Sequence, residues 1–259
     1  NVSGVSSYEV TNIDKVAPAL AISGNATDWT NSDVTLTATT EAGLTIQYND
    51  GTGWADYDAS KGVVMSANGT VTFKVTDAAG NKTTQTIVVD KIDKIAPDAP
   101  VVSASDVATA GNVTVTAAFS SDTAVKQYST DGGVTWINYV DGVIMTDNGT
   151  VQFRGIDKAG NISDVTSHTV SNIDRVAPVL SGITADETAA TNGNVTVTAA
   201  YDSTAAKIEY SLDGKTWYAT TGAVEMTANG LVYFRAIDAL GNVSGVSSYE
   251  VTNIDKVAP

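Results

Sequence analysis

A seven-residue motif occurs four times in this chain and constrains its fold more than any other feature. The copies run from Asn12 to Pro18, Lys91 to Pro97, Asn172 to Pro178 and Asn253 to Pro259. Their aspartates stand at positions 14, 93, 174 and 255, so the repeat lengths are 79, 81 and 81 residues. All five prolines lie inside or just after a copy. Because proline fixes φ and lacks an amide donor, it suits a stiff connector and not a central strand. The sequence therefore predicts tandem units joined by short linkers.

These linkers divide the chain into three predicted units of about 80 residues. We expect residues 15–93, 94–174 and 175–255 to form the first, second and third repeats, and residues 256–259 to begin the next linker. Residues 1–18 are identical to residues 242–259. Residues 1–14 are therefore interpreted as the last strand and linker of a preceding repeat. An unpaired strand is a template for pairing, so we expect residues 1–12 either to fray or to add to the edge of another molecule, continuing the array end to end.

Charge and composition narrow the classes of partner. The chain has 14 basic and 29 acidic residues and a net charge of −15, which argues against nucleic acid or an anionic membrane surface. The same charge favours solubility and cation binding. Without cysteine, the units have neither disulfides nor thiolate metal sites. No apolar run approaches the roughly 20 residues of a membrane span, and there is no signal peptide, as expected of a fragment of a longer protein.

Each unit shows the alternating pattern of half-buried β-strands. The clearest run reads Val-Thr-Leu-Thr-Ala or Val-Thr-Val-Thr-Ala, at residues 34–38, 113–117 and 195–199. A second run leads to an Asp-Gly pair, typical of a tight hairpin. An Asn-Gly turn and a third alternating run around a phenylalanine follow, at residues 71–75, 151–154 and 232–235. About seven short strands per unit, with no helical periodicity, predict an all-β fold: a tandem array of three β-sandwiches.

Aromatic residues recur in register and suggest two roles. We expect the Asp-Gly hairpin to bring a tyrosine (Tyr48, Tyr128, Tyr210) near a tryptophan (Trp54, Trp136, Trp217), as part of the core or its rim. Exposed stacking surfaces for glycans are the alternative, and would use the same tryptophans with Trp29, Tyr57, Tyr139 and Tyr218. Recurrence at the same position of every unit favours packing.

Three motifs resemble those of a known family. Tyr-x-x-Asp-Gly-x-x-Trp, Asp-x-Ala-Gly-Asn and Asp-Lys-x-Ala-Pro resemble the bacterial immunoglobulin-like tandem repeats of giant surface and secreted adhesins, and they cover essentially the whole chain. The first hairpin is one residue shorter, Leu240 replaces the usual alanine, and Lys126 stands where the other units have Ile46 and Ile208. The resemblance implies immunoglobulin-like sandwiches stacked into an extracellular stalk, in several relatives rigidified by calcium at the junctions.

The residues that would support catalysis are scarce. His168 is the only histidine and there is no cysteine, so a catalytic triad, a thiol nucleophile and a histidine-based metal site are all excluded. A site built from paired carboxylates stays open. The acidic residues, however, recur in every unit, as scaffold residues do. We therefore expect no enzyme.

A calcium site at each junction is the sharpest hypothesis. In an immunoglobulin-like sandwich the incoming linker and the loops after the second and sixth strands gather at one pole. Each of these three segments carries one acidic residue in every unit, and Ca²⁺ binds such oxygen ligands. The nine candidate ligands are Asp14, Glu41 and Asp77 in the first unit, Asp93, Asp122 and Asp157 in the second, and Asp174, Asp202 and Asp238 in the third.

A simpler role for these carboxylates is compatible with that hypothesis. Asp77 and its equivalents can accept hydrogen bonds from the amides of their own turns, and the linker aspartates can pair with the adjacent Lys15, Lys94 or Arg175. In function we expect a structural segment of a bacterial cell-surface or secreted protein: an adhesin stalk, surface layer or filament. Its partners would be neighbouring repeats, with no nucleic acid and no membrane insertion. The alternative is a module that binds a host receptor or carbohydrate.

Overall fold

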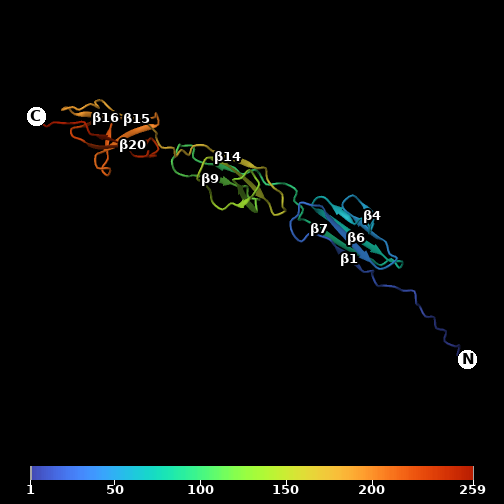
Figure 1. Cartoon of the computed structure of the whole chain (residues 1–259). Helices are drawn as coiled ribbons and strands as arrows, with labels where there is room; N and C mark the ends of the chain where they lie inside the picture. Colours follow the sequence, from blue (N-terminus) through green and yellow to red (C-terminus); the bar gives the residue numbers. More distant parts are fainter. Residues whose placement is uncertain (1, 259) are drawn as a thin grey trace.

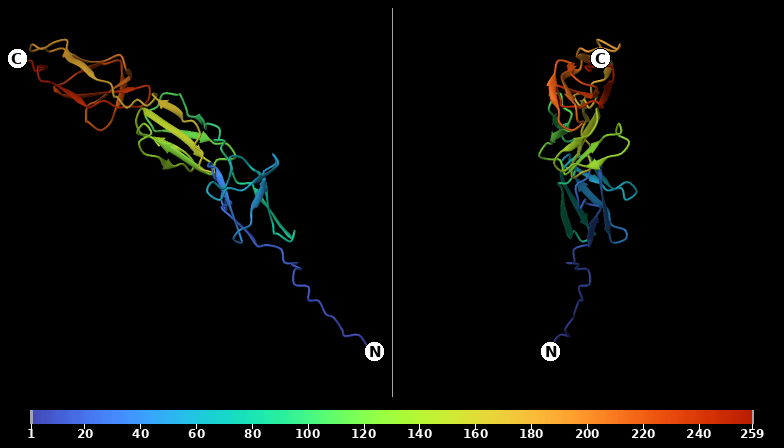
Figure 2. Two further views of the ribbon diagram at one scale, coloured as in Figure 1. Left: turned by 90° about the vertical axis from the view of Figure 1, so that its right-hand side faces the viewer. Right: turned by 60° about the vertical axis from the view of Figure 1, so that its left-hand side comes forward.

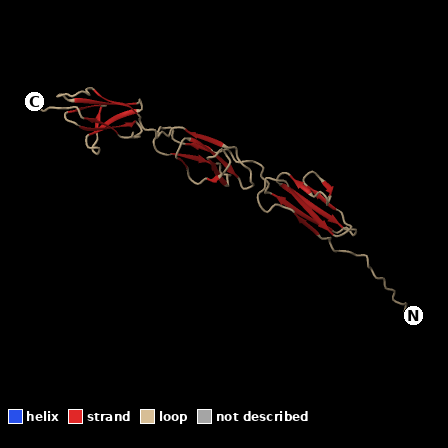
Figure 3. Cartoon of the chain, viewed as in Figure 1, coloured by secondary structure: helices blue, strands red, loops and turns tan. Residues whose placement is uncertain are grey.

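Residues 2–258 are described by a computed structural model in which every regular element is a β-strand. Asn1, assigned above to a preceding repeat, and Pro259, assigned to the next linker, lie outside the described residues. Three all-β bodies follow one another in a row, and the N-terminal segment extends from one end (Figures 1 and 3). Figure 2 shows the same elongated arrangement from two other sides. The expected fold class, three immunoglobulin-like β-sandwiches in tandem, is confirmed. The exact unit boundaries stay predictions.

The first unit contains two antiparallel sheets. Their strand orders are β1-β2-β5 and β4-β3-β6-β7, so the sequence crosses between the sheets as in an immunoglobulin-like sandwich. The strands are β1 (Leu20–Ser23), β2 (Val34–Thr40), β3 (Ile46–Asn49), β4 (Trp54–Asp56), β5 (Val63–Met65), β6 (Gly69–Thr76) and β7 (Lys82–Val89).

The second unit repeats this topology, with sheets β8-β9-β12 and β11-β10-β13-β14. Its strands are β8 (Val101–Ser103), β9 (Val113–Ala118), β10 (Val125–Ser129), β11 (Ile137–Asn138), β12 (Val143–Met145), β13 (Gly149–Ile156) and β14 (Thr166–Val170). The third unit has sheets β15-β16-β19 and β18-β17-β20-β21. Its strands are β15 (Leu180–Ala185), β16 (Val195–Tyr201), β17 (Ala205–Ser211), β18 (Tyr218–Thr220), β19 (Ala223–Met226), β20 (Gly230–Asp238) and β21 (Ser247–Val251).

The alternating runs bury one face of each strand. In β2 the residues Val34, Leu36 and Ala38 are buried while the threonines between them are exposed. The long strands β6, β13 and β20 each place a fully buried phenylalanine at the centre of a core: Phe73, Phe153 and Phe234. The three clusters of buried residues share no member, so each unit has its own thin core. Small cores of this kind bury only about 60% of the unfolded chain's surface, which makes the ends of each sandwich energetically important.

The predicted tight turn of the Asp-Gly hairpin is wrong in detail. The glycines of the Asp-Gly pairs have positive φ, but within the described residues no other residue type does, so these loops are not the tight turns in which both residues need positive φ. In the first unit Asn49 pairs with Trp54, which leaves a four-residue loop. The hairpins place each tyrosine opposite the residue that follows the tryptophan: Tyr48 opposite Ala55, Tyr128 opposite Ile137 and Tyr210 opposite Tyr218. Each hairpin tryptophan also lies under a basic side chain: Lys74 over Trp54, Arg154 over Trp136 and Arg235 over Trp217.

The duplicated sequence adopts two conformations. Residues 247–251 form β21 against β20, whereas the identical residues 6–10 form no strand. Within the described residues, the chain before β1 has no neighbouring sheet with which its backbone could pair. Backbone pairing and burial therefore decide the conformation of this sequence.

Candidate functional site

The linker between two units forms the site at which the repeats are joined. The backbone of Asp93 is hydrogen-bonded to both neighbouring units. Its N–H donates to the carbonyl oxygen of Thr30 in the first unit at 2.9 Å. Its carbonyl oxygen accepts a hydrogen bond from the side chain of Asn161 in the second unit, also at 2.9 Å. Asp174 repeats this arrangement between Thr109 and Asn242. A single linker residue is therefore bonded to two successive sandwiches.

The residue before each linker aspartate completes the core of the preceding unit. Ile92, Ile173 and Ile254 are buried and belong to the three core clusters. Each pairs in parallel with a threonine of the loop between the first two strands of its unit: Thr30, Thr109 and Thr191. The first half of the linker is thus bridged to the preceding sandwich at a single residue.

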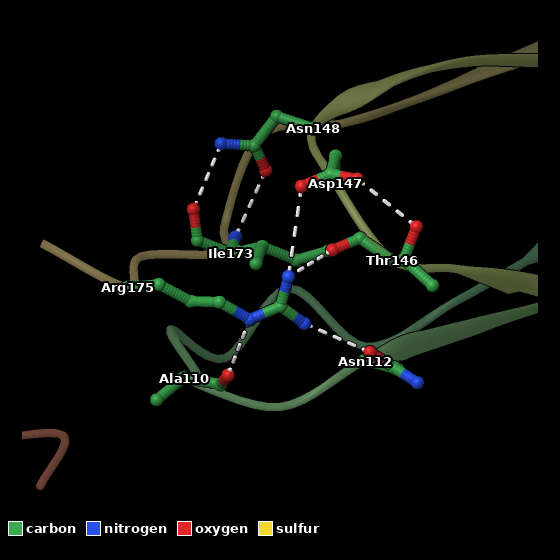
Figure 4. A network of polar contacts seen from close by, with 7 residues as sticks. All are labelled: Ala110, Asn112, Thr146, Asp147, Asn148, Ile173 and Arg175. Atoms are coloured by element: carbon green, nitrogen blue, oxygen red, sulfur yellow. Dashed lines mark hydrogen bonds and ion pairs between the residues drawn. The ribbon is translucent and has the colours of Figure 1, made fainter. Parts of the chain in front are cut away.

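An asparagine of each Asn-Gly turn holds the backbone of that isoleucine. Asn148 accepts from the N–H of Ile173 at 2.9 Å and donates to its carbonyl oxygen at 2.8 Å (Figure 4). The same pair of bonds joins Asn68 to Ile92 and Asn229 to Ile254. A buried backbone group without a hydrogen-bond partner is costly. These asparagine side chains supply partners for the N–H and the carbonyl oxygen of the isoleucine, which no neighbouring strand pairs with.

The basic residue after each linker aspartate also binds the preceding unit. Arg175 donates to the carbonyl oxygens of Ala110 and Thr146 and to the side chain of Asn112, and lies 3.6 Å from Asp147 (Figure 4). In the first unit Lys94 contacts Asp33. The pairing predicted between Lys94 or Arg175 and the adjacent aspartate is therefore wrong. The adjacent carboxylate instead accepts the N–H two residues further on, from Ile95 or Val176.

The following unit grips the linker through the turn after its sixth strand. In this turn clamp, the carboxylate of Asp157 accepts the backbone N–H of Asn161 at 2.8 Å and its side-chain amide at 2.7 Å, which aims the same amide at the carbonyl oxygen of Asp93. The first and third units have equivalent clamps, formed by Asp77 with Asn81 and by Asp238 with Asn242. The clamp therefore occurs wherever a linker enters a unit.

The clamp carboxylates are held in their ionised form. The side chain of Asn81, followed by backbone amides of the turn, holds the pKa of Asp77 below its ordinary value of 3.8, and Asn242 lowers the pKa of Asp238 in the same way. At Asp157 burial opposes ionisation, but the hydrogen bonds from Asn161 and its turn outweigh it and leave a lowered pKa. The expected turn-capping role of these aspartates matches this geometry.

The structure brings the predicted metal ligands together only in part. Asp14, Glu41 and Asp77 line one hollow, and Asp93, Asp122 and Asp157 line another. Within residues 2–258, however, no group of three acidic or histidine side chains is close enough to hold a metal ion. Several are engaged elsewhere: Glu41 accepts the N–H of Ala19, Asp122 the hydroxyl of Ser120, and Asp202 the N–H of Val179. As metal ligands, Asp174, Asp202, Asp238 and the other six stay a prediction.

One junction has an additional aromatic contact. Trp29, in the loop after β1, lines the same hollow as Asp93, Asp122 and Asp157. The corresponding positions before Thr109 and Thr191 are alanines, Ala108 and Ala190. The junction between the first and second units thus has a large aromatic side chain at a position where the other units have alanine.

The other residues considered in the sequence analysis lie in the strands or pack against the cores. Tyr57 and Tyr139 pack against the cores and accept the N–H of Ala38 and Ala117, so they are not free stacking surfaces. His168 lies on β14 opposite Val151. Lys126 extends over the ring of Phe119. No helix long and apolar enough to cross a membrane occurs between residues 2 and 258.

Sequence reasoning missed the asparagines that hold the linker. The sequence pattern indicates only turns at these positions. The Asn-Gly turns contain Asn68, Asn148 and Asn229, and the Asp-x-Ala-Gly-Asn motifs end at Asn81, Asn161 and Asn242. Their signal is a constant spacing: Asn68, Asn148 and Asn229 precede the linker isoleucine by 24 or 25 residues, although glycine alone would suffice for a turn. A side chain that serves a partner distant in sequence gives no local pattern.

The fold and the junctions define a tandem immunoglobulin-like repeat protein. The sequence matches no family model. An alignment of 182 positions with the PII-type proteinase of Lacticaseibacillus paracasei is 31% identical and covers 62% of this chain but 10% of that protein. The PII-type proteinase of Lactococcus lactis subsp. cremoris is 32% identical over the same length, with 10% of it covered. The chain thus spans about one tenth of the curated relatives it matches.

A solved structure supports the fold. It belongs to a Ca²⁺-stabilised adhesin with which an Antarctic bacterium reaches out and binds ice, and it matches with a TM-score of 0.53 at 15% sequence identity. The match covers 93% of this chain and 74% of that one. Similarity at this level shows a shared all-β tandem architecture.

Proposed function

We propose that this chain is a structural segment of a long bacterial protein exposed at the cell surface or secreted, such as an adhesin stalk, a surface layer or a filament, and that it has no catalytic activity. Three observations support the proposal: the stacked sandwiches, the sequence similarity to a tenth of two large bacterial proteinases, and the fold shared with an adhesin. The net charge of −15 keeps such a segment soluble outside the cell.

The bonding of the linker aspartates to both neighbours carries this proposal. A linker fixed only to one unit would let the next unit swivel, whereas Asp93 is bonded to Thr30 on one side and Asn161 on the other. Each such bond contributes about 1 kcal/mol, and the linker's proline removes further freedom. The function of the segment is then to keep the neighbouring parts of the protein at a fixed distance from each other.

Distances across the junctions test the proposal. The chain lacks cysteine, so spin labels can be placed at Thr70, Thr150 and Leu231, three equivalent exposed positions on β6, β13 and β20. Pulsed electron-spin measurements on the double variants T70C/T150C and T150C/L231C should give narrow distance distributions in both cases. Broad distributions of the kind produced by freely jointed units would contradict a stiff segment.

Calcium at the junctions is a second proposal, favoured by the hollow that Asp93, Asp122 and Asp157 share. The carboxylates would have to leave part of their present hydrogen bonding to converge on one ion, so the site is not preformed. Thermal melts in Ca²⁺ and in chelator test it, with Asp122→Asn as the matched variant. Binding predicts a higher melting temperature in Ca²⁺ for the unaltered chain and a smaller gain for D122N. Equal melting temperatures would remove calcium and leave the hydrogen-bonded junction intact.

A further inference from the structure

One position at the end of the second strand differs between the first unit and the other two. Thr40 ends β2, whereas Phe119 and Tyr201 stand at the equivalent place, two residues after the alanine that closes the alternating run. Strand pairing supports this equivalence, because Leu20 lies opposite Thr40 and Leu180 lies opposite Tyr201. The first unit therefore has a small polar side chain where the other units have an aromatic ring.

In the other units this ring packs between the sheets. Phe119 lies against the core of the second unit, and its ring centroid is 5.4 Å from that of Tyr139. The Nζ atom of Lys126 lies 5.6 Å from the centroid of the same ring. Tyr201 likewise packs against the core of the third unit. The fold thus provides a place at this end of the sandwich that an aromatic ring fills.

A hollow of about 380 Å³ lies at the corresponding place in the first unit. Its lining includes Thr40, Tyr57 and Ile46, which are the counterparts of the phenylalanine, tyrosine and lysine of the second unit. Ile46 is buried, and Tyr57 and Leu44 are half-buried. The deep part of the hollow is therefore apolar and has one aromatic wall.

The rim of this hollow carries a negative charge. Glu41 is exposed and lines the hollow, and its carboxylate accepts the N–H of Ala19 at 3.0 Å. An ionised carboxylate can accept about four hydrogen bonds, so Glu41 can accept others from a ligand. The second unit has Lys126 where the first has Ile46, so the first unit differs from it by both a ring and a cation. The net charge of −15 also favours a cationic ligand.

We propose that the hollow of the first unit is a binding site for a six-membered aromatic ring that carries an ammonium group on a short alkyl chain. The ring lies against Tyr57, Leu44 and Ile46, in the place that Phe119 fills in the second unit, and the ammonium group donates to Glu41. The volume is ample, since an apolar cavity of about 150 Å³ holds benzene in another protein. A ligand of this size should bind with a dissociation constant in the millimolar range. The inference goes beyond the proposed function, which stands if it fails.

Titration of the full chain with phenethylamine tests the proposal, with amide NMR shifts as the readout. The titration is run in chelator, so that no divalent cation competes for Glu41. Saturable shifts should be concentrated at the residues that line the hollow, including Ala38, Leu44 and Ile46. The control n-butylamine, which has the charge without the ring, should give no saturable shift. Absence of saturation by phenethylamine, or equal shifts in all three units, would overturn the proposal.

Replacement of Glu41 tests the position of the ammonium group. Glu41→Gln should weaken phenethylamine at least threefold and leave the affinity for 2-phenylethanol, which lacks the charge, unchanged. A loss shared equally by both probes would show that the substitution alters the shape of the hollow, and an unchanged phenethylamine affinity would show that the ammonium group binds elsewhere. Either result contradicts the proposed site.

Exchange of the distinguishing residues between the units is the matched control. Thr40→Phe should fill the hollow and abolish the phenethylamine shifts in the first unit. The reciprocal variant F119T/S120E/K126I gives the second unit the residues of the first at these positions and should create a saturable site there. A folded T40F chain that still binds the probe in its first unit overturns the proposal. A folded reciprocal variant that gains no site does so too, because the three residues would then not define the hollow.

Discussion

The side-chain amide of Asn161 donates to the backbone carbonyl oxygen of Asp93 at 2.9 Å, so a residue of the second unit holds the linker that closes the first. The carboxylate of Asp157 orients that amide from the other side at 2.7 Å. Two residues 68 positions apart therefore set how one sandwich follows another. In the proposed stiff segment, this contact would limit the movement of one unit against the next.

Replacing Asn161 by alanine should loosen the first junction and leave the second unit folded. The change removes the bond to Asp93 and one bond to Asp157, which together contribute about 1–2 kcal/mol, while the core around Phe153 is untouched. In the T70C/T150C background, N161A should broaden the distance distribution clearly. The melting temperature of the second unit should fall by about 4–8 °C for each kcal/mol lost, and the unit should stay folded at 25 °C.

Asn242→Ala is the matched control, because Asn242 makes the same contact with Asp174 at the next junction. It should broaden only the T150C/L231C distribution and leave T70C/T150C narrow. If each substitution broadened both distributions, the junctions would be coupled and the clamp would not act locally. If neither did, the clamp would be a turn cap without a role in joining units.

The alternation of buried and exposed residues along each strand is what allows the fold to be predicted from the sequence. A buried residue at every second position, as at Val34, Leu36 and Ala38, specifies a strand and the face it buries without knowledge of its partners. The Asp-Gly hairpin was less accessible, because the same pair serves both tight turns and longer loops. The basic side chains over the tryptophans could not be predicted locally, because Arg154 and Trp136 are far apart in sequence and come together where β13 pairs with β10.

The sequence predicts where the acidic residues gather, but not which hydrogen-bond partners their carboxylates have. Sandwich topology correctly gathers Asp93, Asp122 and Asp157 around one hollow. Whether their oxygens converge depends on side-chain partners that differ from residue to residue, such as Ser120 for Asp122 and Asn161 for Asp157. Such competition between local hydrogen-bond donors and a shared ion leaves no trace in the spacing of acidic residues.

Asn148→Ala should destabilise the second unit. Ile173 is buried, and the substitution leaves its N–H and carbonyl oxygen without the partners shown in Figure 4, at a cost of about 1–3 kcal/mol. Hydrogen exchange of β13 and β14 should accelerate while the first unit is unaffected. Thr150→Ala removes only an exposed hydroxyl pair with Thr169, so it should change stability by less than about 0.5 kcal/mol. Similar effects of the two would count against the asparagine's role.

Gly24→Ala should be the more damaging of two glycine substitutions in the first unit. Gly24 has a φ of +93°, and an added Cβ would lie 2.2 Å from the carbonyl oxygen of Thr35. Gly80 has a similar φ of +91° but open space around it, so G80A carries only the backbone strain of about 1–2 kcal/mol. Comparing thermal melts separates the two costs. Equal losses would mean that β1 shifts freely away from β2.

Glu209→Gln should weaken the third unit in a pH-dependent way. Glu209 is buried and accepts hydrogen bonds from Lys207 and Arg235, whereas Gln47 and Gln127 occupy the same position in the other units. At neutral pH the loss of charge should cost about 1 kcal/mol, visible as faster hydrogen exchange in β17 and β20. The reciprocal change Gln127→Glu should slow exchange in β10 and β13, because Arg154 already lies opposite.

The direction of the pH effect follows from the lowered pKa of Glu209. Hydrogen bonds from Lys207 and then Arg235 favour the ionised carboxylate in the folded state, so its pKa falls below the ordinary value of 4.5. The stabilisation is therefore complete well above pH 4.5 and is lost as the pH falls through the lowered pKa of the folded protein. The difference between the unaltered chain and E209Q should be constant from pH 8 to about 6 and shrink towards zero in acid. A difference that persisted in strong acid would show that the glutamate acts through packing and not through its charge.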